Sequence, residues 1–392
     1  MPLALSRRID AIRDTGPDGW DIHYKSRAMA EAGEAVLRLT VGEHDIRTDP
    51  SILAAMAASA AAGNTGYTLG PGTRALRDAV AQRVQSRTGV ATSYRHVIIT
   101  PGGQAALFAG HMAVCNDGDR ALFCDPYYAT YPGTIRAAGA IAEAVPTRAE
   151  NAFQPTRDVL LHHAPGARSL LINSPNNPTG VVYDRATMAA IAGVVQAHNL
   201  WLISDEVYDT QVWDGVHLSP RALPGMAERT IVVGSMSKSH AMTGFRVGWM
   251  VAPEAVVDAV TLLATNTTYG LPGFIQDAAL FALTKGPAFE KAVAAPFLRR
   301  RAIAARVLAQ QNTVGMIPSS GAMYLMLDVR ATGLSGEEFA ARLLAEDRIA
   351  VMPGESFGAA AAGYVRVAMT IDDAAFEEAL VRLVAFAARN RG

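Results

Sequence analysis

The sequence predicts an α/β protein with a large domain built on a mostly parallel sheet flanked by helices, and with a smaller α+β domain. From about residue 96 to residue 235, short apolar runs alternate with helical stretches. Continuously apolar strands separated by helices are typical of a parallel sheet covered on both faces. The C-terminal residues alternate strand and helix again after a mainly helical stretch, which indicates the second domain. A chain of 392 residues, half of them hydrophobic, is long enough for both.

Domain boundaries are predicted where this pattern changes. The predicted parts are an N-terminal arm that contributes to the small domain (1–45), the large domain (46–290) and the small C-terminal domain (291–392). Ahead of the sheet, the helix over 50–62 is delimited most clearly, because Pro50 stands at its first turn and Gly63 just past its end. The other elements expected in this part are a short N-terminal helix, a helix over 26–33, a strand at 35–39, a glycine-rich loop over 64–72 and a helix over 73–87.

The remaining elements follow from the same alternation. The strands expected in the large sheet are residues 97–99, 121–123, 140–142, 170–172, 200–203 and 231–233, with helices between them that include 104–114 and 184–198. The chain is expected to be mainly helical from 253 to 311, and the small domain to contain strands at 323–327 and 364–367 and helices over 336–347 and from 372. Arginines 299–301 are interpreted as a solvated helix face, because no aromatic residues are interleaved with them.

Composition excludes several classes of protein. The net charge of −1, with 18% charged residues, gives no sign of binding to nucleic acid or to an anionic membrane. Two cysteines, Cys115 and Cys124, predict neither a disulfide framework nor a metal site. The N-terminus has no apolar core of signal-peptide length, and no apolar stretch approaches the roughly 18 residues of a membrane span. A soluble, cytoplasmic protein is expected.

The most informative stretch runs from Ser235 to Ser239 and directly follows a buried strand, with Arg246 further on. One interpretation is a surface turn in which Lys238 faces water, and for any single lysine that interpretation is the better one. The other is a lysine that forms a Schiff base with pyridoxal phosphate, with Ser235 and Arg246 on the phosphate. The choice depends on whether other strand ends supply the rest of such a site.

Four other strand ends do carry suitable residues, and ligands of parallel sheets sit at these ends. Each has an ordinary structural explanation when it is taken alone: a tight turn, ring packing, turn chemistry or a helix cap. Together they would supply a phosphate cradle, a ring for stacking, amide donors and a buried acid that needs a partner. The stretches are residues 100–104, 125–131, 173–180 and 204–208, of which the last contains Asp205.

With these motifs the chain resembles the class I/II aminotransferases, which have fold type I and use pyridoxal phosphate. The matching motifs are residues 174–180 (SPNNPTG), 205–208 (DEVY), 235–239 (SMSKS) and 246–248 (RVG), and the resemblance extends from about Gly42 to Arg366. It implies a seven-stranded sheet in the large domain and a homodimer with shared active sites. It also implies transfer of an amino group from an L-amino acid to a 2-oxo acid by a ping-pong mechanism.

The resemblance assigns cofactor roles to individual residues. Lys238 would form the Schiff base, and Asp205 would keep the pyridine nitrogen protonated. Asn177 and Tyr208 would bind the phenolic oxygen of the ring. Tyr128 would stack on the ring. The phosphate would be held by Gly103, Gln104, Ser235, Arg246 and, from a neighbouring subunit, Tyr67.

The resemblance also addresses the substrate. Arg366 would clamp the α-carboxylate, with Asn177 nearby, and Gly42 would leave space for it. The sequence departs from the family pattern at two positions: His44 replaces a proline, and Gln104 replaces a lysine or serine. The shape of the substrate pocket therefore does not follow from the resemblance. Three further stretches (20–24, 237–244 and 274–279) are similar to family members that act on arginine with pyruvate.

The sequence leaves more than one possibility for the amino donor and for the type of reaction. A basic or broad-range amino donor with pyruvate as acceptor is favoured, since a guanidinium substrate needs an acid and a dicarboxylate needs a second cation. Asp21, Glu43 and Asp45 could supply that acid, although each is explained equally well as a solvated or capping residue. A carbon–sulfur β-lyase or an arginine oxidase would use the same cofactor. A non-catalytic domain that senses pyridoxal phosphate is disfavoured, because residues 1–45 are too short for a DNA-binding unit.

Overall fold

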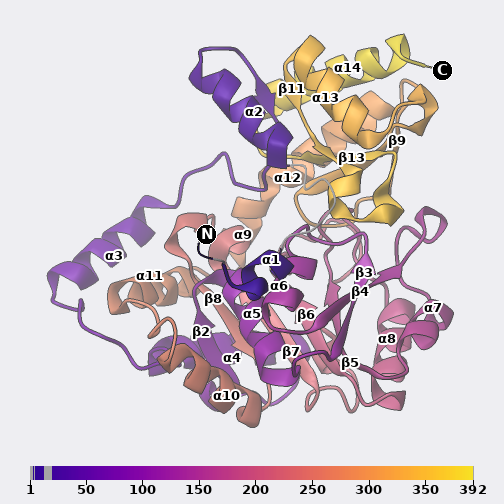
Figure 1. Ribbon diagram of the computed structural model, residues 1–392. Helices are drawn as coiled ribbons and strands as arrows, with labels where there is room; N and C mark the ends of the chain where they lie inside the picture. The colour runs from indigo at the N-terminus through magenta and orange to yellow at the C-terminus, as the bar shows by residue number, and fades with distance from the viewer. Residues whose placement is uncertain (1–2, 4, 13–19, 392) are drawn as a thin grey trace.

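The large domain is built on a seven-stranded sheet with the strand order β2-β8-β7-β6-β5-β3-β4 (Figure 1). The computed structural model describes residues 3, 5–12 and 20–391, so residues 13–19 of the predicted N-terminal arm lie outside the description. Neighbouring strands are parallel except where β8 pairs antiparallel with β2 and with β7. The strands are β2 (Val97–Thr100), β3 (Arg120–Asp125), β4 (Ile141–Pro146), β5 (Ala167–Asn173), β6 (Trp201–Asp205), β7 (Thr230–Ser235) and β8 (Gly248–Val251).

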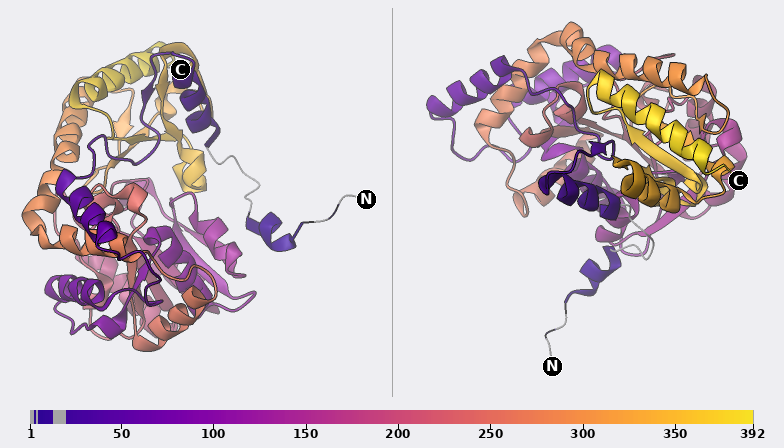
Figure 2. Two further views of the ribbon diagram at one scale, coloured as in Figure 1. Left: turned by 90° about the vertical axis from the view of Figure 1, so that its left-hand side faces the viewer. Right: turned by 90° about the horizontal axis from the view of Figure 1, so that it is seen from above.

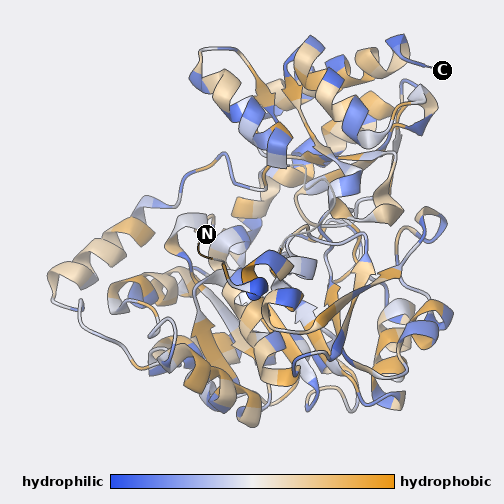
Figure 3. Ribbon diagram, viewed as in Figure 1, coloured by the Kyte–Doolittle hydropathy of each residue, from blue (hydrophilic) through white to orange (hydrophobic). Residues whose placement is uncertain are grey.

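Helices cover both faces of this sheet, which explains why its central strands are apolar at consecutive positions (Figure 3). In β5, for example, Leu171 packs with α5 and α10, whereas Leu170 and Ile172 pack with α8 on the opposite face. The helices of the first face are α5 (Gly102–Val114), α6 (Tyr131–Ala137) and α10 (Glu254–Thr265). Those of the second are α4 (Arg74–Thr88), α7 (Arg157–His163), α8 (Arg185–Ala197) and α11 (Gly273–Thr284), and α3 (Pro50–Ala61) packs against α11.

The small domain has an antiparallel sheet of order β12-β13-β10-β9, and a short parallel pair, β1 with β11. Figure 2 shows α14 lying along α12 on the outside of this domain. Its strands are β1 (Leu37–Arg38), β9 (Gly315–Met316), β10 (Tyr324–Asp328), β11 (Ile349–Ala350), β12 (Met352–Pro353) and β13 (Tyr364–Ala368). Its helices are α2 (Trp20–Glu31), α12 (Gly286–Leu308), α13 (Gly336–Asp347) and α14 (Asp373–Arg389), while the short α1 (Arg7–Ile12) contacts α6 of the large domain.

The sequence-based prediction of the fold class is confirmed, and the structure corrects three details. The helix expected from Ser26 begins at Trp20, because residues 20–24 form its first turn and Ile22 packs on the core of the small domain. The strand β8 was not predicted. Arg300 is not part of a solvated face: its side chain is only 3% exposed and bonds Asp45 and Asp373, two acids from distant segments.

The two domains are joined through α12, which packs against α14 in the small domain and reaches α9 (Met236–Ser239) in the large one. We propose domain boundaries near residues 45 and 290, because β1 belongs to the small domain and α12 begins at Gly286. Among the described helices, none combines the length and the apolar character that a membrane span requires.

Candidate active site

All of the predicted site residues except Tyr67 line one cavity of about 320 Å³. It lies at the carboxyl ends of β5, β6 and β7, where the two domains meet, because Arg366 of β13 and Tyr324 of β10 complete its wall. The predicted residues that line it are Gly42, Gly103, Gln104, Tyr128, Asn177, Asp205, Tyr208, Ser235, Lys238, Arg246 and Arg366.

Lys238 lies in α9, the four-residue helix that directly follows β7. The side chain of Ser235 caps this helix by accepting a hydrogen bond from the Ser237 N–H at 3.1 Å. The Lys238 amine donates to the carbonyl oxygen of Gly42. Burial, opposed by Glu43 but reinforced by two nearby guanidinium groups, lowers the pKa of Lys238 to about 8. Lys238 is partly buried and lines the cavity rather than facing bulk water, so the surface-turn interpretation is excluded.

Asp205 ends β6 and is only 4% exposed. It accepts a hydrogen bond from the Tyr131 hydroxyl at 2.7 Å and one from the Val207 N–H at 3.3 Å. Burial outweighs these bonds and raises the pKa of Asp205 to about 6. The carboxylate therefore lies in a buried position where a cationic N–H from a ligand would stabilise its charged form.

Tyr131 was not assigned a role from the sequence, where it was one of three clustered tyrosines. Its ring is buried against Tyr128 at 5.7 Å in an edge-on arrangement. The spacing of the tyrosines along the chain does not show which ring packs and which hydroxyl reaches the acid. Tyr131 is the first residue of α6, and the position of this helix places its hydroxyl beside Asp205.

An anion site lies at the start of α5. Gly103 and Gln104, in the first turn of this 13-residue helix, line the cavity. Gly102 has a φ of +78°, and a Cβ there would collide with the guanidinium of Arg246. Arg246 is thereby held against the helix N-terminus, and the two together form a site suited to a phosphate group.

Arg366 is 5% exposed and projects from the middle of β13. Its guanidinium donates to the Asn177 side-chain oxygen at 3.0 Å and to the Thr40 carbonyl. The rings of Phe357 and Tyr324 lie 4.4 Å and 4.5 Å from its guanidinium carbon. Because the side-chain oxygen of Asn177 accepts a hydrogen bond from Arg366, the amide N–H groups of Asn177 remain available to donate to a ligand. A cation fixed in this way is suited to a carboxylate.

Tyr208 and Gly42 also meet near Tyr324, a residue that the sequence did not single out. The hydroxyl groups of Tyr208 and Tyr324 lie 3.1 Å apart. A Cβ on Gly42 would fall on the Tyr324 hydroxyl, so the glycine makes room for this tyrosine. Space for a substrate carboxylate at Gly42 remains a prediction.

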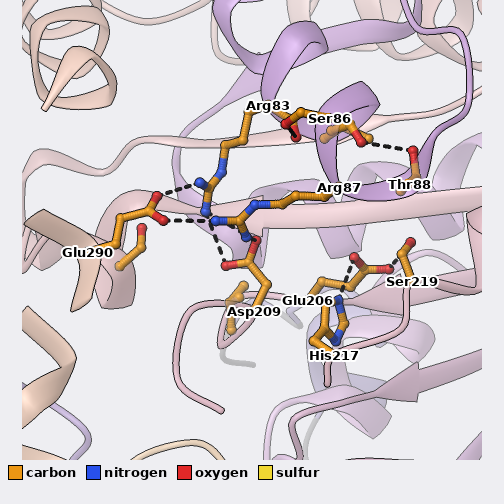
Figure 4. A network of polar contacts seen from close by, with 12 residues as sticks. Arg83, Ser86, Arg87, Thr88, Glu206, Asp209, His217, Ser219 and Glu290 are labelled. Carbon is orange, nitrogen blue, oxygen red and sulfur yellow. Dashed lines mark hydrogen bonds and ion pairs between the residues drawn. The ribbon is translucent and has the colours of Figure 1, made fainter. Parts of the chain in front are cut away.

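The turn that follows β6 and carries Tyr208 is held in place by a largely buried network of ion pairs (Figure 4). Arg83 and Arg87 of α4 each bind both Asp209, which lies in this turn, and Glu290 of α12. The Arg83–Asp209 and Arg87–Glu290 distances are 3.1 Å and 2.8 Å. Burial opposes the charge of Asp209, but the two guanidinium groups prevail and lower its pKa. The network therefore ties the turn to helices on both sides of it.

Tyr67 lies outside the cavity, in the loop between α3 and α4. It is 91% exposed, and its ring packs in a tilted arrangement, with ring centroids 5.1 Å apart, against Tyr269, itself 57% exposed. Leu69 in the same loop is 72% exposed. These three residues form an apolar patch on the surface of the single chain.

The family comparison agrees with this geometry. A model of the family described as aminotransferase class I and II matches residues 34–383. The chain belongs to this family. It is 41% identical over 382 residues to an arginine–pyruvate transaminase of Pseudomonas aeruginosa, and the match covers 97% of each chain. It is 32% identical to the aspartate/prephenate aminotransferase of Thermus thermophilus, over 96% of this chain and 97% of the relative.

Solved structures of aminotransferases have the same fold. The aspartate aminotransferase of Thermus thermophilus with maleate superimposes with a TM-score of 0.92 at 30% identity, over 98% of this chain and all of that one. This aminotransferase therefore transfers an amino group from an amino acid to a 2-oxo acid and uses pyridoxal 5′-phosphate.

The residues present fit this cofactor. The N-terminus of α5 with Arg246 suits the phosphate, and the buried Asp205 suits a protonated pyridine nitrogen. Lys238 offers an amine whose lowered pKa favours the neutral, nucleophilic form. Tyr128, half-buried at the cavity wall, offers a flat ring.

Proposed function

We propose that this transaminase moves the amino group of L-arginine, or of another basic or broad-range L-amino acid, to a 2-oxo acid such as pyruvate by a ping-pong mechanism. The main support is the 41% identity, over 97% of the chain, to an arginine–pyruvate transaminase. The charges of the cavity favour the same donor. Its cationic lining residues in the described chain are Lys238, Arg246 and Arg366, and each has another proposed task. None is left for the second carboxylate of a dicarboxylic donor.

A donor screen with pyruvate as acceptor, in which alanine formation is measured, tests this proposal. Arginine is expected to be among the fastest donors, with lysine and ornithine as further basic candidates. Rapid turnover of aspartate and glutamate together with no turnover of arginine would overturn the substrate assignment.

The proposed chemistry centres on Lys238. Bound pyridoxal phosphate supplies a ring that withdraws electrons from the donor's α-carbon and carries the amino group between the two half-reactions. Lys238 Nζ would take the α-proton of the donor and give it back within the cavity as the amino group is transferred. Because burial lowers the pKa of this amine to about 8, part of the population is neutral near physiological pH. Asp205 holds the proton on the ring nitrogen.

The other side chains position the reactants. Asn177 and Tyr208 would donate to the phenolic oxygen of the ring, and Tyr128 would stack on it. Gly103, Gln104, Ser235 and Arg246 hold the phosphate. Arg366 holds the α-carboxylate of the substrate, which aligns the α-proton with Lys238.

Arg366→Lys is expected to lower kcat/KM for every amino donor by about 10- to 100-fold, the equivalent of losing one charge-assisted hydrogen bond. A lysine keeps the charge but cannot form the paired, planar contacts of a guanidinium. Steady-state kinetics with alanine and arginine measure the effect. Arg330→Lys, an exposed change in the same domain, is the matched control. A decrease of less than twofold in Arg366→Lys would remove this arginine from carboxylate binding.

We also propose a homodimer in which Tyr67 reaches the phosphate of the neighbouring subunit. Support comes from the exposed patch formed by Tyr67, Leu69 and Tyr269. It also comes from the phosphate end of the cavity, where Gln104 and Arg246 are exposed in the single chain. A neighbouring subunit would cover both surfaces at once.

Coexpression of Lys238→Ala with Tyr67→Ala tests this sharing. Each variant alone is expected to be weakly active or inactive. Mixed dimers would contain one doubly altered site and one intact site, so up to about a quarter of wild-type activity should return if the chains pair at random. If Tyr67 served its own subunit, no mixed dimer would contain an intact site and activity would not return. Sedimentation of each variant controls for dimer formation.

We propose a cytoplasmic location as well. Both cysteines, Cys115 and Cys124, are buried free thiols, a state typical of proteins in a reducing compartment. Cell fractionation with antibody detection would test this location.

A further inference from the structure

Of the three acids that could meet a basic substrate, the structure leaves one in the cavity. Asp45 is occupied: its carboxylate binds Arg300 at 2.6 Å, and the arginine side chain is 3% exposed. Asp21 is exposed in the first turn of α2 and does not line the cavity. Glu43 does line it. The sequence could not separate these residues, since all three lie in polar N-terminal segments.

Glu43 is positioned by neighbours on both sides. The preceding residue, Gly42, accepts the hydrogen bond of Lys238 through its carbonyl oxygen, so Glu43 is joined directly to the reacting end of the cavity. The Thr243 hydroxyl donates to Glu43 Oε1 at 3.1 Å, which links the carboxylate to the loop after Lys238. Among the hydrogen bonds of the described residues, this is the one that Glu43 accepts through its side chain. Its second oxygen is therefore available to a ligand.

The distribution of charge distinguishes Glu43 from the other acid of the cavity. Asp205 is 4% exposed and is bonded to Tyr131 at the cofactor end. Glu43 is exposed, and it shares the cavity lining with Trp20. A carboxylate with an aromatic ring in one cavity suits a flat cation, which can donate to the first and stack on the second.

We propose that Glu43, together with Trp20, forms the subsite that binds the distal cationic group of a basic amino donor. This inference rests on the proposed function and names the residues that set its substrate class. A guanidinium fits best, because its planar fork matches a carboxylate and its face stacks on an aromatic ring. Glu43 acts in specificity only: it accepts no proton from the reacting carbon.

Arginine and citrulline form the matched pair of donors that tests the subsite, since citrulline has the same shape and a neutral ureido group. The wild-type enzyme is expected to favour arginine in kcat/KM. Glu43→Gln should lower kcat/KM for arginine about tenfold or more, as expected when a charge-assisted hydrogen bond is lost, and leave citrulline within about twofold. Asp21→Asn, an acid outside the cavity, should change neither donor.

Binding of unreactive analogues gives a readout that does not depend on turnover. The dissociation constants of 5-guanidinopentanoate and 5-ureidopentanoate, measured by calorimetry on the holoenzyme, should differ in the wild type and converge in Glu43→Gln. Trp20→Leu should weaken binding of the guanidino analogue by a smaller factor than Glu43→Gln does.

Different results would contradict the subsite and the proposed function. Equal effects of Glu43→Gln on both analogues and both donors would overturn the subsite, whereas absence of amino transfer from every donor would overturn the proposed function.

Discussion

Lys238→Ala is expected to abolish both turnover and the visible absorbance of the covalently bound cofactor. The alanine removes the only amine that the cavity's described lining provides, so the nucleophile and the proton carrier are lost together. Turnover should fall by about 10⁴-fold or more, the scale of losing a positioned acid–base group and covalent catalysis. Absorbance spectra of the purified variant with added cofactor, and alanine formation from pyruvate, measure the two effects.

Lys291→Ala, an exposed lysine of α12, is the control for this change and should leave both signals intact. Normal turnover in Lys238→Ala would contradict the assignment.

The pKa of about 8 at Lys238 gives a second prediction, which is tested on the wild-type apoenzyme. Because the neutral amine is the nucleophile, its population rises as the pH passes upward through 8. The rate of cofactor attachment should therefore rise with pH and level off above that value.

Asp205→Asn is expected to reduce kcat by about 10²- to 10⁴-fold while leaving the cofactor attached to Lys238. An amide has nearly the same size as the carboxyl group but cannot stabilise a protonated ring nitrogen, so electron withdrawal from the α-carbon weakens. Rapid-mixing measurements of the donor half-reaction isolate this step from cofactor binding. A kcat within threefold of the wild type would show that the ring does not depend on this acid. Asp258→Asn, an exposed residue of α10, is the control.

The pKa of about 6 at Asp205 also predicts how cofactor affinity depends on pH. Burial raises this pKa above its ordinary value, so the carboxyl group becomes protonated as the pH falls through 6. The neutral form can no longer pair with a cationic ring nitrogen. The dissociation constant of the cofactor should therefore rise below pH 6 in the wild type, and Asp205→Asn should lack this particular rise.

The fold and the cofactor end of the site could be predicted from the sequence because both depend on local patterns. Apolar runs fixed the strands, and the polar residues directly after them had to meet at one edge of the sheet. Asp205 and Lys238 are examples, since Asp205 is the last residue of β6 and Lys238 lies in the short helix that directly follows β7.

Contacts between distant segments could not be predicted in the same way. Arg300 was misinterpreted because its two acid partners come from other parts of the chain. Tyr131 reaches Asp205 only through the placement of α6, and Tyr324 enters the cavity from the small domain. The substrate end of the cavity is made of such contacts, which is why Glu43 could be chosen from three acids only after Asp45 was found on Arg300.

The most direct test of the central claim is a single half-reaction. The purified holoenzyme is mixed with excess L-arginine and no oxo acid, and the products are counted per subunit. The proposed function predicts one equivalent of the 2-oxo acid of arginine per subunit, no ammonia or hydrogen peroxide, and loss of the cofactor's visible band. Subsequent addition of pyruvate should restore the band and yield one equivalent of alanine. Continued product release without an acceptor, accompanied by ammonia, would contradict a transaminase that uses arginine.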